Sequence, residues 1–367
     1  MMDGLTVGTL LPASWFAGGN PWLLAVIAVV GMVIVIKGAD LLVEGAAGLA
    51  RRLGMPEVVV GATIVSLGTT SPEMAVSVMA AWGGNAGLAL GNGVGSIIAD
   101  TGLIFGLGCV LAVLPADRFV LARQGWVQFG VAALLAGMCY GLYAVHGDAA
   151  VLGRGVGAGL LVLLVGYLVV SVKWAKQHPM GEPHLLVEED GSTTSDRKPH
   201  GEKSAGALVG LLVVGLAMVV VAGDGLVQSV SEVAIQLGMP KAVVAATLVA
   251  LGTSLPELVV GITAIRRGHP ELLVGNVIGA DILNVLFVIG AAALAKPLPI
   301  VEALPPEAGG GVSYAFLSIQ LPTMLAMLVL FRLYIFRAGK RGGFEKWMGW
   351  PLLVMYFAFI ALNFLRG

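Results

Sequence analysis

Long runs of hydrophobic residues alternate along the chain with short polar segments. A helix needs about 20 predominantly apolar residues to cross a bilayer, and ten runs approach or exceed that length. Backbone polar groups have no water to bond in hydrocarbon, and the runs are too long and continuous for barrel strands. We therefore predict an all-α membrane protein of about ten transmembrane helices in a lipid bilayer. The expected spans lie at about 22–49, 56–81, 86–114, 125–145, 151–172, 205–236, 240–265, 271–295, 313–336 and 347–364.

Hydrophobic residues make up 57% of the 367-residue chain and charged residues 12%, against a usual charged share of roughly 25%. This composition excludes a soluble globular enzyme. The net charge of −1 provides no basic field for nucleic acid. Cys109 and Cys139 are isolated within apolar runs, so we expect buried thiols rather than a disulfide or metal ligands. The first twenty residues contain no Lys or Arg, so we do not expect a cleavable signal peptide.

The distribution of positive charge predicts the orientation, because Lys and Arg in short loops stay on the cytoplasmic side of the membrane. Threading the ten spans places sixteen of the 21 Lys and Arg residues on one side and four on the other, with Lys37 inside the first span. We expect both the N- and the C-terminus outside. The expected location is the cell membrane, which is the inner membrane in a bacterium.

One long hydrophilic segment, residues 173–204, separates an N-terminal half, 1–172, from a C-terminal half, 205–367. Its Pro, Gly, Ser and Thr residues and its mixed charges are typical of a flexible linker, which we expect in the cytoplasm. Three histidines lie in it among acidic residues, and a metal-sensing cluster is the alternative interpretation. Their spacing shows no pattern, so we favour a solvated coil.

The two halves share a sequence repeat. Shifting the chain by 184 positions aligns GMPEVVVGATIVSLGTTSPEM, from Gly54, with GMPKAVVAATLVALGTSLPEL, from Gly238, without a gap. Five spans, an odd number, separate equivalent helices, so the second copy enters the membrane from the opposite side. Two inverted-topology repeats of five helices are typical of transporters whose substrate site lies near the midplane. A duplication without transport is the alternative.

A break is predicted within the second span of each copy. The runs Leu67–Glu73 and Leu251–Glu257 place a glycine, hydroxyls and a proline inside an apolar helix. Proline removes a backbone donor and frees carbonyls near Ser66 and Ala250 to bond something else. A glutamate follows each break about halfway through the membrane, where an unpaired carboxylate is costly enough to require a cation or a proton.

Further oxygen-bearing side chains recur at helical spacing around these glutamates. Thr69 and Glu73 are four residues apart, as are Ser96 and Asp100, so each pair shares a helix face. The second copy has Thr253 with Glu257, and Ala280 with Asn284. All the polar groups among them are hard oxygen donors, which favours Ca²⁺ or alkali ions over zinc or copper, with Mg²⁺ less suited. For each hydroxyl alone, a hydrogen bond between helices is the alternative.

Charge balance suggests how such a site works. The carboxylates of Glu73, Glu257 and Asp100 are neutralised by three monovalent ions, or by one divalent ion with one monovalent ion or proton. Either load neutralises the same oxygens. If the empty, charged site resists crossing, the protein exchanges one load for the other rather than leaking.

These paired G-T-[ST]-x-P-E motifs, each followed by G-N-x-x-G, resemble the cation/Ca²⁺ exchanger superfamily, and its Na⁺/Ca²⁺ exchanger branch in particular. The match covers two alpha-repeats, at about 40–108 and 224–292, and the ten-span layout. The resemblance implies transport of Ca²⁺ and Na⁺ without a cofactor, no enzymatic activity, and sliding of spans 1 and 6 against the other eight. It also implies these ligands: Glu73 and Glu257 at the centre; hydroxyl or carbonyl oxygens of Thr69, Thr70, Thr253 and Ser254; backbone oxygens of Ser66 and Ala250; and Ser96, Asp100 and Asn284 in flanking positions.

The chain departs from the family pattern in the second copy. Where relatives commonly carry G-S-N, this chain has Ala280 followed by Asp281, so one Na⁺-type hydroxyl is missing. Asp281 either compensates for it or faces a polar interface, and the sequence leaves both open. At another equivalent pair of positions the first copy has an acid, Asp100, and the second an amide, Asn284. Exchanging the two would not change the total charge, but their order leaves the number of bound ions and the dependence on K⁺ open. For Asp40 and Glu44 in span 1 we favour pairing with Lys37 over a role in an ion path.

The sequence predicts a compact, prokaryotic-type secondary antiporter that exchanges Ca²⁺ for Na⁺ by alternating access around a midplane carboxylate site. We expect no obligatory protein partner. H⁺-coupled or K⁺-dependent exchange is the alternative within transport. An intramembrane hydrolase using paired acids and a channel are alternatives from other classes. A mid-membrane Ser/His or Gly-x-Gly-Asp arrangement is absent, and a carboxylate at a break in both repeats favours an occluding site.

Overall fold

The computed structural model describes residues 11–116, 118–177, 203–238, 250–303 and 312–366, and these are helical almost throughout. Within these ranges seven helices are long and apolar enough to cross a membrane. The predicted total of ten stays a prediction, because three of the expected spans are not complete long helices here. The stretch 56–81 is broken, 240–265 lies partly outside the described residues, and 347–364 corresponds to a 3-10 turn and one helix of 18 residues.

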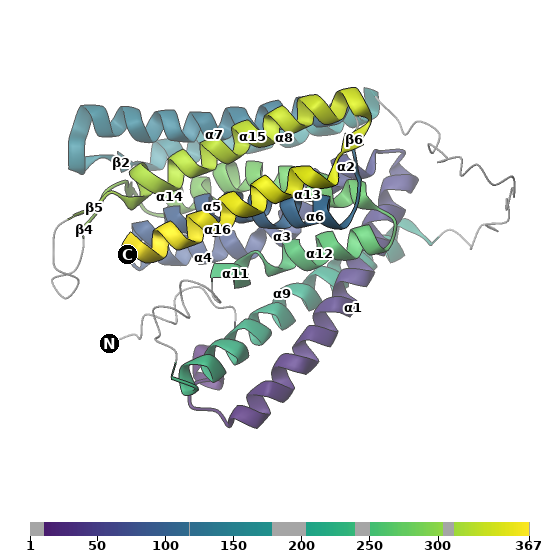
Figure 1. The fold of residues 1–367 in the computed structure, drawn as a ribbon, viewed down its shortest axis with the longest axis horizontal. Helices are drawn as coiled ribbons and strands as arrows, with labels where there is room; N and C mark the ends of the chain where they lie inside the picture. The colour runs from purple at the N-terminus through teal and green to yellow at the C-terminus, as the bar shows by residue number, and fades with distance from the viewer. Residues whose placement is uncertain (1–10, 117, 178–202, 239–249, 304–311, 367) are drawn as a thin grey trace, which may run out of the picture.

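Two long helices, α1 (Pro21–Leu53) and α9 (Ala205–Gln236), lie side by side at the edge of the molecule (Figure 1). Glycines allow their backbones to approach closely, which is how helices associate in lipid. A Cβ atom on Gly38 would lie 2.7 Å from the Cβ of Met218, and one on Gly215 would lie 2.5 Å from the carbonyl oxygen of Gly38. These helices correspond to predicted spans 1 and 6.

The predicted break is present in both halves. In the first, the α2 helix (Glu57–Val60), the π-helical segment η2 (Gly61–Val65) and α3 (Ser66–Thr69) precede α4 (Ser71–Trp82). In the second, α11 (Ala250–Thr253) precedes α12 (Leu255–Arg266). A proline occupies the first turn of both α4 and α12, where its missing N–H leaves no intrahelical bond unmade. Each break therefore starts a new helix just before its glutamate.

The following helices each contain a π-helical turn. The order is α5 (Ala86–Ala99), η3 (Asp100–Phe105) and α6 (Gly106–Leu111) in the first half. In the second half it is α13 (Pro270–Leu283), η6 (Asn284–Ile289) and α14 (Gly290–Ala295). All these bounds recur 184 positions later, as a duplicated unit predicts. The inverted orientation of the copies and the division into halves at 172 and 205 stay predictions.

The remaining long helices cover the side away from α1 and α9 (Figure 1): α7 (Arg118–His146), α8 (Arg154–Gln177) and α15 (Leu321–Arg341), with α16 (Gly349–Arg366) beside α6. Short 3-10 and π-helical turns are also present in the described ranges: η1 (Ala13–Trp15), η4 (Gly147–Ala149), η8 (Phe316–Gln320) and η9 (Lys346–Met348). Inside this part, the ring centroids of Phe105 and Phe331 lie 4.5 Å apart in an edge-to-face contact.

Antiparallel pairs of two-residue strands join the helix ends. They are β1 (Leu114–Pro115) with β6 (Gly343–Phe344), β2 (Val151–Leu152) with β3 (Leu298–Pro299), and β4 (Glu302–Ala303) with β5 (Val312–Ser313). The first two pairs each tie a segment of one half to a segment of the other.

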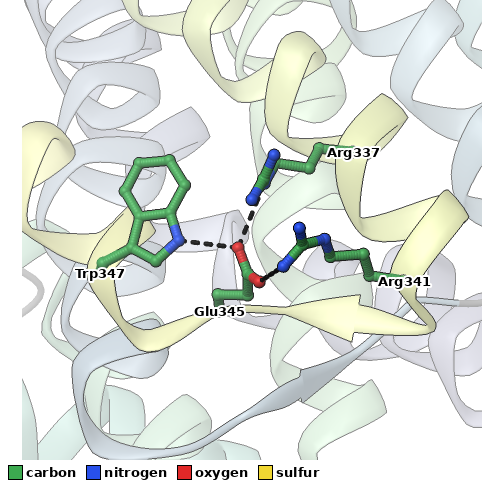
Figure 2. A network of polar contacts seen from close by, with 4 residues as sticks. All are labelled: Arg337, Arg341, Glu345 and Trp347. Carbon is green, nitrogen blue, oxygen red and sulfur yellow. Dashed lines mark hydrogen bonds and ion pairs between the residues drawn. The ribbon is translucent and has the colours of Figure 1, made fainter.

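The turn between α15 and α16 is held by a polar cluster around Glu345 (Figure 2). The carboxylate accepts hydrogen bonds from the indole N–H of Trp347 at 2.7 Å and from Arg337 at 3.1 Å, and it also pairs with Arg341. The bond from Trp347, followed by those from the two arginines, outweighs partial desolvation and lowers the pKa of Glu345 to about 2.

Two ion pairs correct the expectation for span 1. Asp40 accepts a hydrogen bond from Arg267 at 2.8 Å, and Glu44 pairs with Lys203; neither carboxylate pairs with Lys37. The reason is the packing of the helices. Arg267 follows α12 and Lys203 precedes α9, and both of these helices pack against α1, which brings the two cations to its carboxylates. Cys109 and Cys139 are free and buried, as predicted. The linker histidines lie outside the described residues.

Candidate ion-binding site

Two glutamates occupy equivalent positions in the first turns of α4 and α12. Glu73 and Glu257 are each 1% exposed. Both carboxylate oxygens of Glu73, and Oε2 of Glu257, have no hydrogen-bond partner among the described residues. The first turn of a helix favours negative charge, because its N–H groups are not used within the helix. That interaction does not offset the burial of a carboxylate, so these groups need a cation or a proton.

A direct contact brings the two breaks together. The hydroxyl of Thr70, at the break in the first half, donates to Oε1 of Glu257 in the second half across 3.5 Å. Glu73 lies within electrostatic reach of both Glu257 and Asp100. The carboxylates of the two halves therefore face a common region, which is the arrangement that the repeat predicts.

A second pair of contacts crosses between the halves in the same way. The hydroxyl of Thr69 donates to Oδ1 of Asn276 at 3.3 Å, and that of Thr253 donates to Oδ1 of Asn92 at 3.5 Å. The amide of Asn92 also donates to the carbonyl of Glu73 at 3.2 Å. Thus each threonine that precedes a break is oriented by an asparagine from the opposite half.

Asn92 and Asn276 are absent from the predicted ligand set. The signal was present, because both asparagines belong to the G-N-x-x-G segments of the repeat. Sequence spacing places each of them on its own helix but gives no information on contacts between halves. That is why only the structure shows them beside Thr253 and Thr69.

An acid and an amide meet at the start of the two π-helical turns. Asn284, the first residue of η6, donates to Oδ2 of Asp100, the first residue of η3, across 3.4 Å. Ser96 is buried one helical turn before Asp100, and its equivalent Ala280 is buried without a hydroxyl. A π-turn widens the helix and leaves some carbonyls out of the regular ladder, and such turns occur often at functional sites.

The backbone at Ser66 differs from the expectation. Its carbonyl is not freed by the break, since it accepts from the N–H of Thr70 at 2.8 Å and from the hydroxyl of Thr69 at 3.4 Å. The hydroxyl of Thr69 has one hydrogen and shares it between this carbonyl and Oδ1 of Asn276, so the lasting bond to Ser66 is the one from the N–H of Thr70. The reason is that Pro72 lacks its N–H four residues after Gly68, not after Ser66. Ala250 opens α11, where the described chain resumes.

Neutral oxygens complete the surroundings. Ser254 lies at the second break, is 4% exposed, and its hydroxyl has no partner among the residues described. No three acidic, histidine or cysteine side chains of the described ranges converge as a metal-binding group. The oxygens that the described residues offer a cation here are those of paired carboxylates, hydroxyls and amides. That donor set suits Ca²⁺ and Na⁺ and not a transition metal.

Comparisons with known proteins agree with this architecture. The family model described as "Sodium/calcium exchanger protein" matches residues 23–173 and 207–365. The inner membrane protein YrbG of Escherichia coli is 30% identical over 89% of this chain and 97% of its own, and the sodium/calcium exchanger MaX1 of Methanosarcina acetivorans is 29% identical over 92% and 97%.

Among solved structures, the sodium-calcium exchanger NCX_Mj soaked with Na⁺ and Sr²⁺ superposes with a TM-score of 0.73. It is 26% identical, and the alignment covers 93% of this chain and 99% of that one. The apolar spanning helices make this a membrane protein. The family match extends over most of both halves, so the resemblance found in the sequence is confirmed: the chain belongs to the sodium/calcium exchanger protein family.

Proposed function

We propose that this protein is a secondary active antiporter that exchanges Ca²⁺ for Na⁺ by alternating access around Glu73 and Glu257. The observation that carries the proposal is the pair of buried glutamates, one from each half, joined through the contact between Thr70 and Glu257. No Lys or Arg forms an ion pair with either glutamate within the described part of the chain. The names of MaX1 and NCX_Mj, both sodium/calcium exchangers, support Ca²⁺ and Na⁺ as the transported ions.

Exchange follows from competition for shared oxygens. Ca²⁺ is held by the two glutamates with oxygens such as those of Thr69, Thr253 and Ser254. Na⁺ ions occupy the same region and neutralise Glu73, Glu257 and Asp100 individually. Because the carboxylates are buried and repel each other when empty, the unloaded site resists the conformational change, and one load crosses only in exchange for the other. The protein needs no cofactor for this and catalyses no covalent chemistry.

The pair α1–α9 is the moving element in this proposal. Glycines hold its two helices in close contact with each other, so that they can move as one unit. Many of its large apolar side chains are exposed, as expected for a lipid-facing surface. The ion pair between Asp40 and Arg267 joins α1 to the end of α12 and is remade when the pair moves. Both termini lie outside the cell in the proposed orientation.

Uptake of Ca²⁺ into vesicles containing the purified protein tests the proposal. Outward gradients of Na⁺, K⁺ and protons are imposed in turn, and only the Na⁺ gradient is expected to drive rapid uptake. Glu73→Gln and Glu257→Gln abolish uptake, since the amide keeps the shape and loses the charge. Glu345→Gln, the same exchange in a loop outside the membrane, retains it. Uptake driven by protons or requiring K⁺ favours the alternative couplings, and robust flux in either glutamate variant refutes the site.

A further inference from the structure

A fourth buried carboxylate lies outside the predicted ligand set. Asp281, on α13, is 2% exposed and follows the position where the second copy lacks a hydroxyl. Its Oδ2 accepts hydrogen bonds from the hydroxyl of Thr101 and from the amide of Gln128, each at 2.6 Å. Its Oδ1 is buried and has no partner among the described residues. Two neutral donors on one oxygen leave the charge of this group unneutralised.

The surroundings of Asp281 contain further unpartnered oxygen. Gln124 lies one helical turn before Gln128, on the same face of α7, which packs against α13. The side chain of Gln124 is fully buried, and neither its amide oxygen nor its nitrogen has a partner among the residues described. A buried amide without partners is rare in proteins and indicates a ligand or water that completes its hydrogen bonds.

This cluster joins residues of both halves but has no counterpart in the repeat. The repeat places Ile97 where the second copy has Asp281, and Val285 where the first has Thr101. The cluster is therefore not inherited from the duplication, although it is connected to the candidate site. Thr101 directly follows Asp100, and Asp281 precedes Asn284 by three residues on α13, so a charge at either carboxylate is felt by the other.

We propose that Asp281, Thr101 and Gln128 bind a monovalent cation, Na⁺ under exchange conditions, at a position distinct from the Glu73–Glu257 pair. The carboxylate supplies Oδ1, and the hydroxyl and amide supply neutral oxygens. One carboxylate with neutral oxygens suits a single positive charge, whereas Ca²⁺ takes six to eight oxygens, usually from several carboxylates. Adjacent residues on a helix point about 100° apart, so Asp281 supplies a Na⁺ ligand at a different place from the hydroxyl missing at Ala280. This inference rests on the proposed exchange function for its role in transport, but binding is measured independently of transport.

Equilibrium dialysis of the purified protein against radioactive Na⁺ tests the site directly. Asp281→Asn is expected to bind one Na⁺ fewer at saturation than the unaltered protein, while Ca²⁺ affinity measured without Na⁺ is retained. Thr101→Val, which keeps the side-chain shape, is expected to weaken binding of that Na⁺ by about tenfold or more. Thr263→Val alters another buried threonine, on α12, and is expected to bind Na⁺ as the unaltered protein does.

The outcomes separate the explanations. An unchanged number and affinity of bound Na⁺ in Thr101→Val and Asp281→Asn overturns the inference. So does an unchanged Na⁺ number with an altered pH dependence, because Asp281 then carries a proton. If Asp281→Asn does not fold, Thr101→Val decides the question. Loss of one Na⁺ in a protein that shows no Na⁺-driven Ca²⁺ uptake contradicts the proposed exchange and leaves the binding site standing.

Discussion

Gly275→Ala is predicted to slow transport by about 100-fold although glycine and alanine differ by one methyl group. A Cβ atom at Gly275 lies 2.1 Å from the carbonyl oxygen of Val58, and the neighbouring backbone carbon is 2.8 Å away. The obstacle is the main chain of Val58 on α2, which cannot rotate aside as a side chain can. Restoring ordinary contact requires α13 to move from α2 by about 1 Å.

That displacement reaches the site at once, because the next residue is Asn276. Its oxygen accepts from Thr69 at 3.3 Å, a bond already near its limit. A misplacement of about 1 Å in a preorganised site costs on the order of 100-fold in activity, and the overpacking itself destabilises by about 1–3 kcal/mol. We expect the rate of Na⁺-driven Ca²⁺ uptake to fall by about 100-fold.

The first copy supplies the matched control. Gly91 occupies the same repeat position on α5, but a Cβ there meets only the side-chain amide of Gln320 at 3.6 Å, an ordinary contact. Gly91→Ala should therefore transport as the unaltered protein does. Uptake is compared in vesicles containing equal amounts of folded protein, as judged by gel filtration. Equal rates for Gly275→Ala and Gly91→Ala refute the argument that close contact between α13 and α2 positions the site.

Three further predictions follow from particular contacts. Asn276→Ala removes the acceptor of Thr69 without removing charge, so Ca²⁺ affinity should fall less than in Glu257→Gln; an equal or larger loss in equilibrium dialysis contradicts this order. Asp40→Asn breaks the partly exposed ion pair with Arg267, worth about 0.2–1 kcal/mol, and should alter the uptake rate by about fivefold or less; complete loss of uptake shows another role. Glu345 has a pKa of about 2, below its ordinary value, so its stabilising effect is present above about pH 4.3 and is lost as pH falls through about 2. Thermal unfolding followed by tryptophan fluorescence should show this pH dependence weakened in Glu345→Gln, and an identical profile contradicts the assignment.

The sequence predicts the helical class and the breaks because both depend on local physics. Hydropathy identifies long helices wherever a run is continuous, as in α1 and α9. Proline within the run Leu67–Glu73 marks the start of α4, since it has no N–H for the preceding turn. The same reasoning places Glu73 and Glu257 in buried first turns, as the structure shows.

The local pattern of residues along the chain does not predict which side chains of the two halves contact each other. The pairing of Asp40 with Arg267 involves residues 227 positions apart, whereas Lys37 is near only in sequence. The partners of Asp281 come from η3 and α7, which no spacing rule connects to α13. Repeat symmetry is the one sequence signal that extends across the halves. It identifies Asn92 and Asn276 as equivalent but does not give their threonine partners.

Binding of Ca²⁺ to the purified protein tests the central claim most directly. Equilibrium dialysis with radioactive Ca²⁺ compares the unaltered protein with Glu73→Gln and Glu257→Gln, with Glu345→Gln as the matched exchange outside the membrane. The account predicts Ca²⁺ binding that added Na⁺ displaces, unchanged in Glu345→Gln and weakened by at least about tenfold to 100-fold in each of the other two variants. Unaltered Ca²⁺ affinity in either Glu73→Gln or Glu257→Gln contradicts a shared carboxylate site.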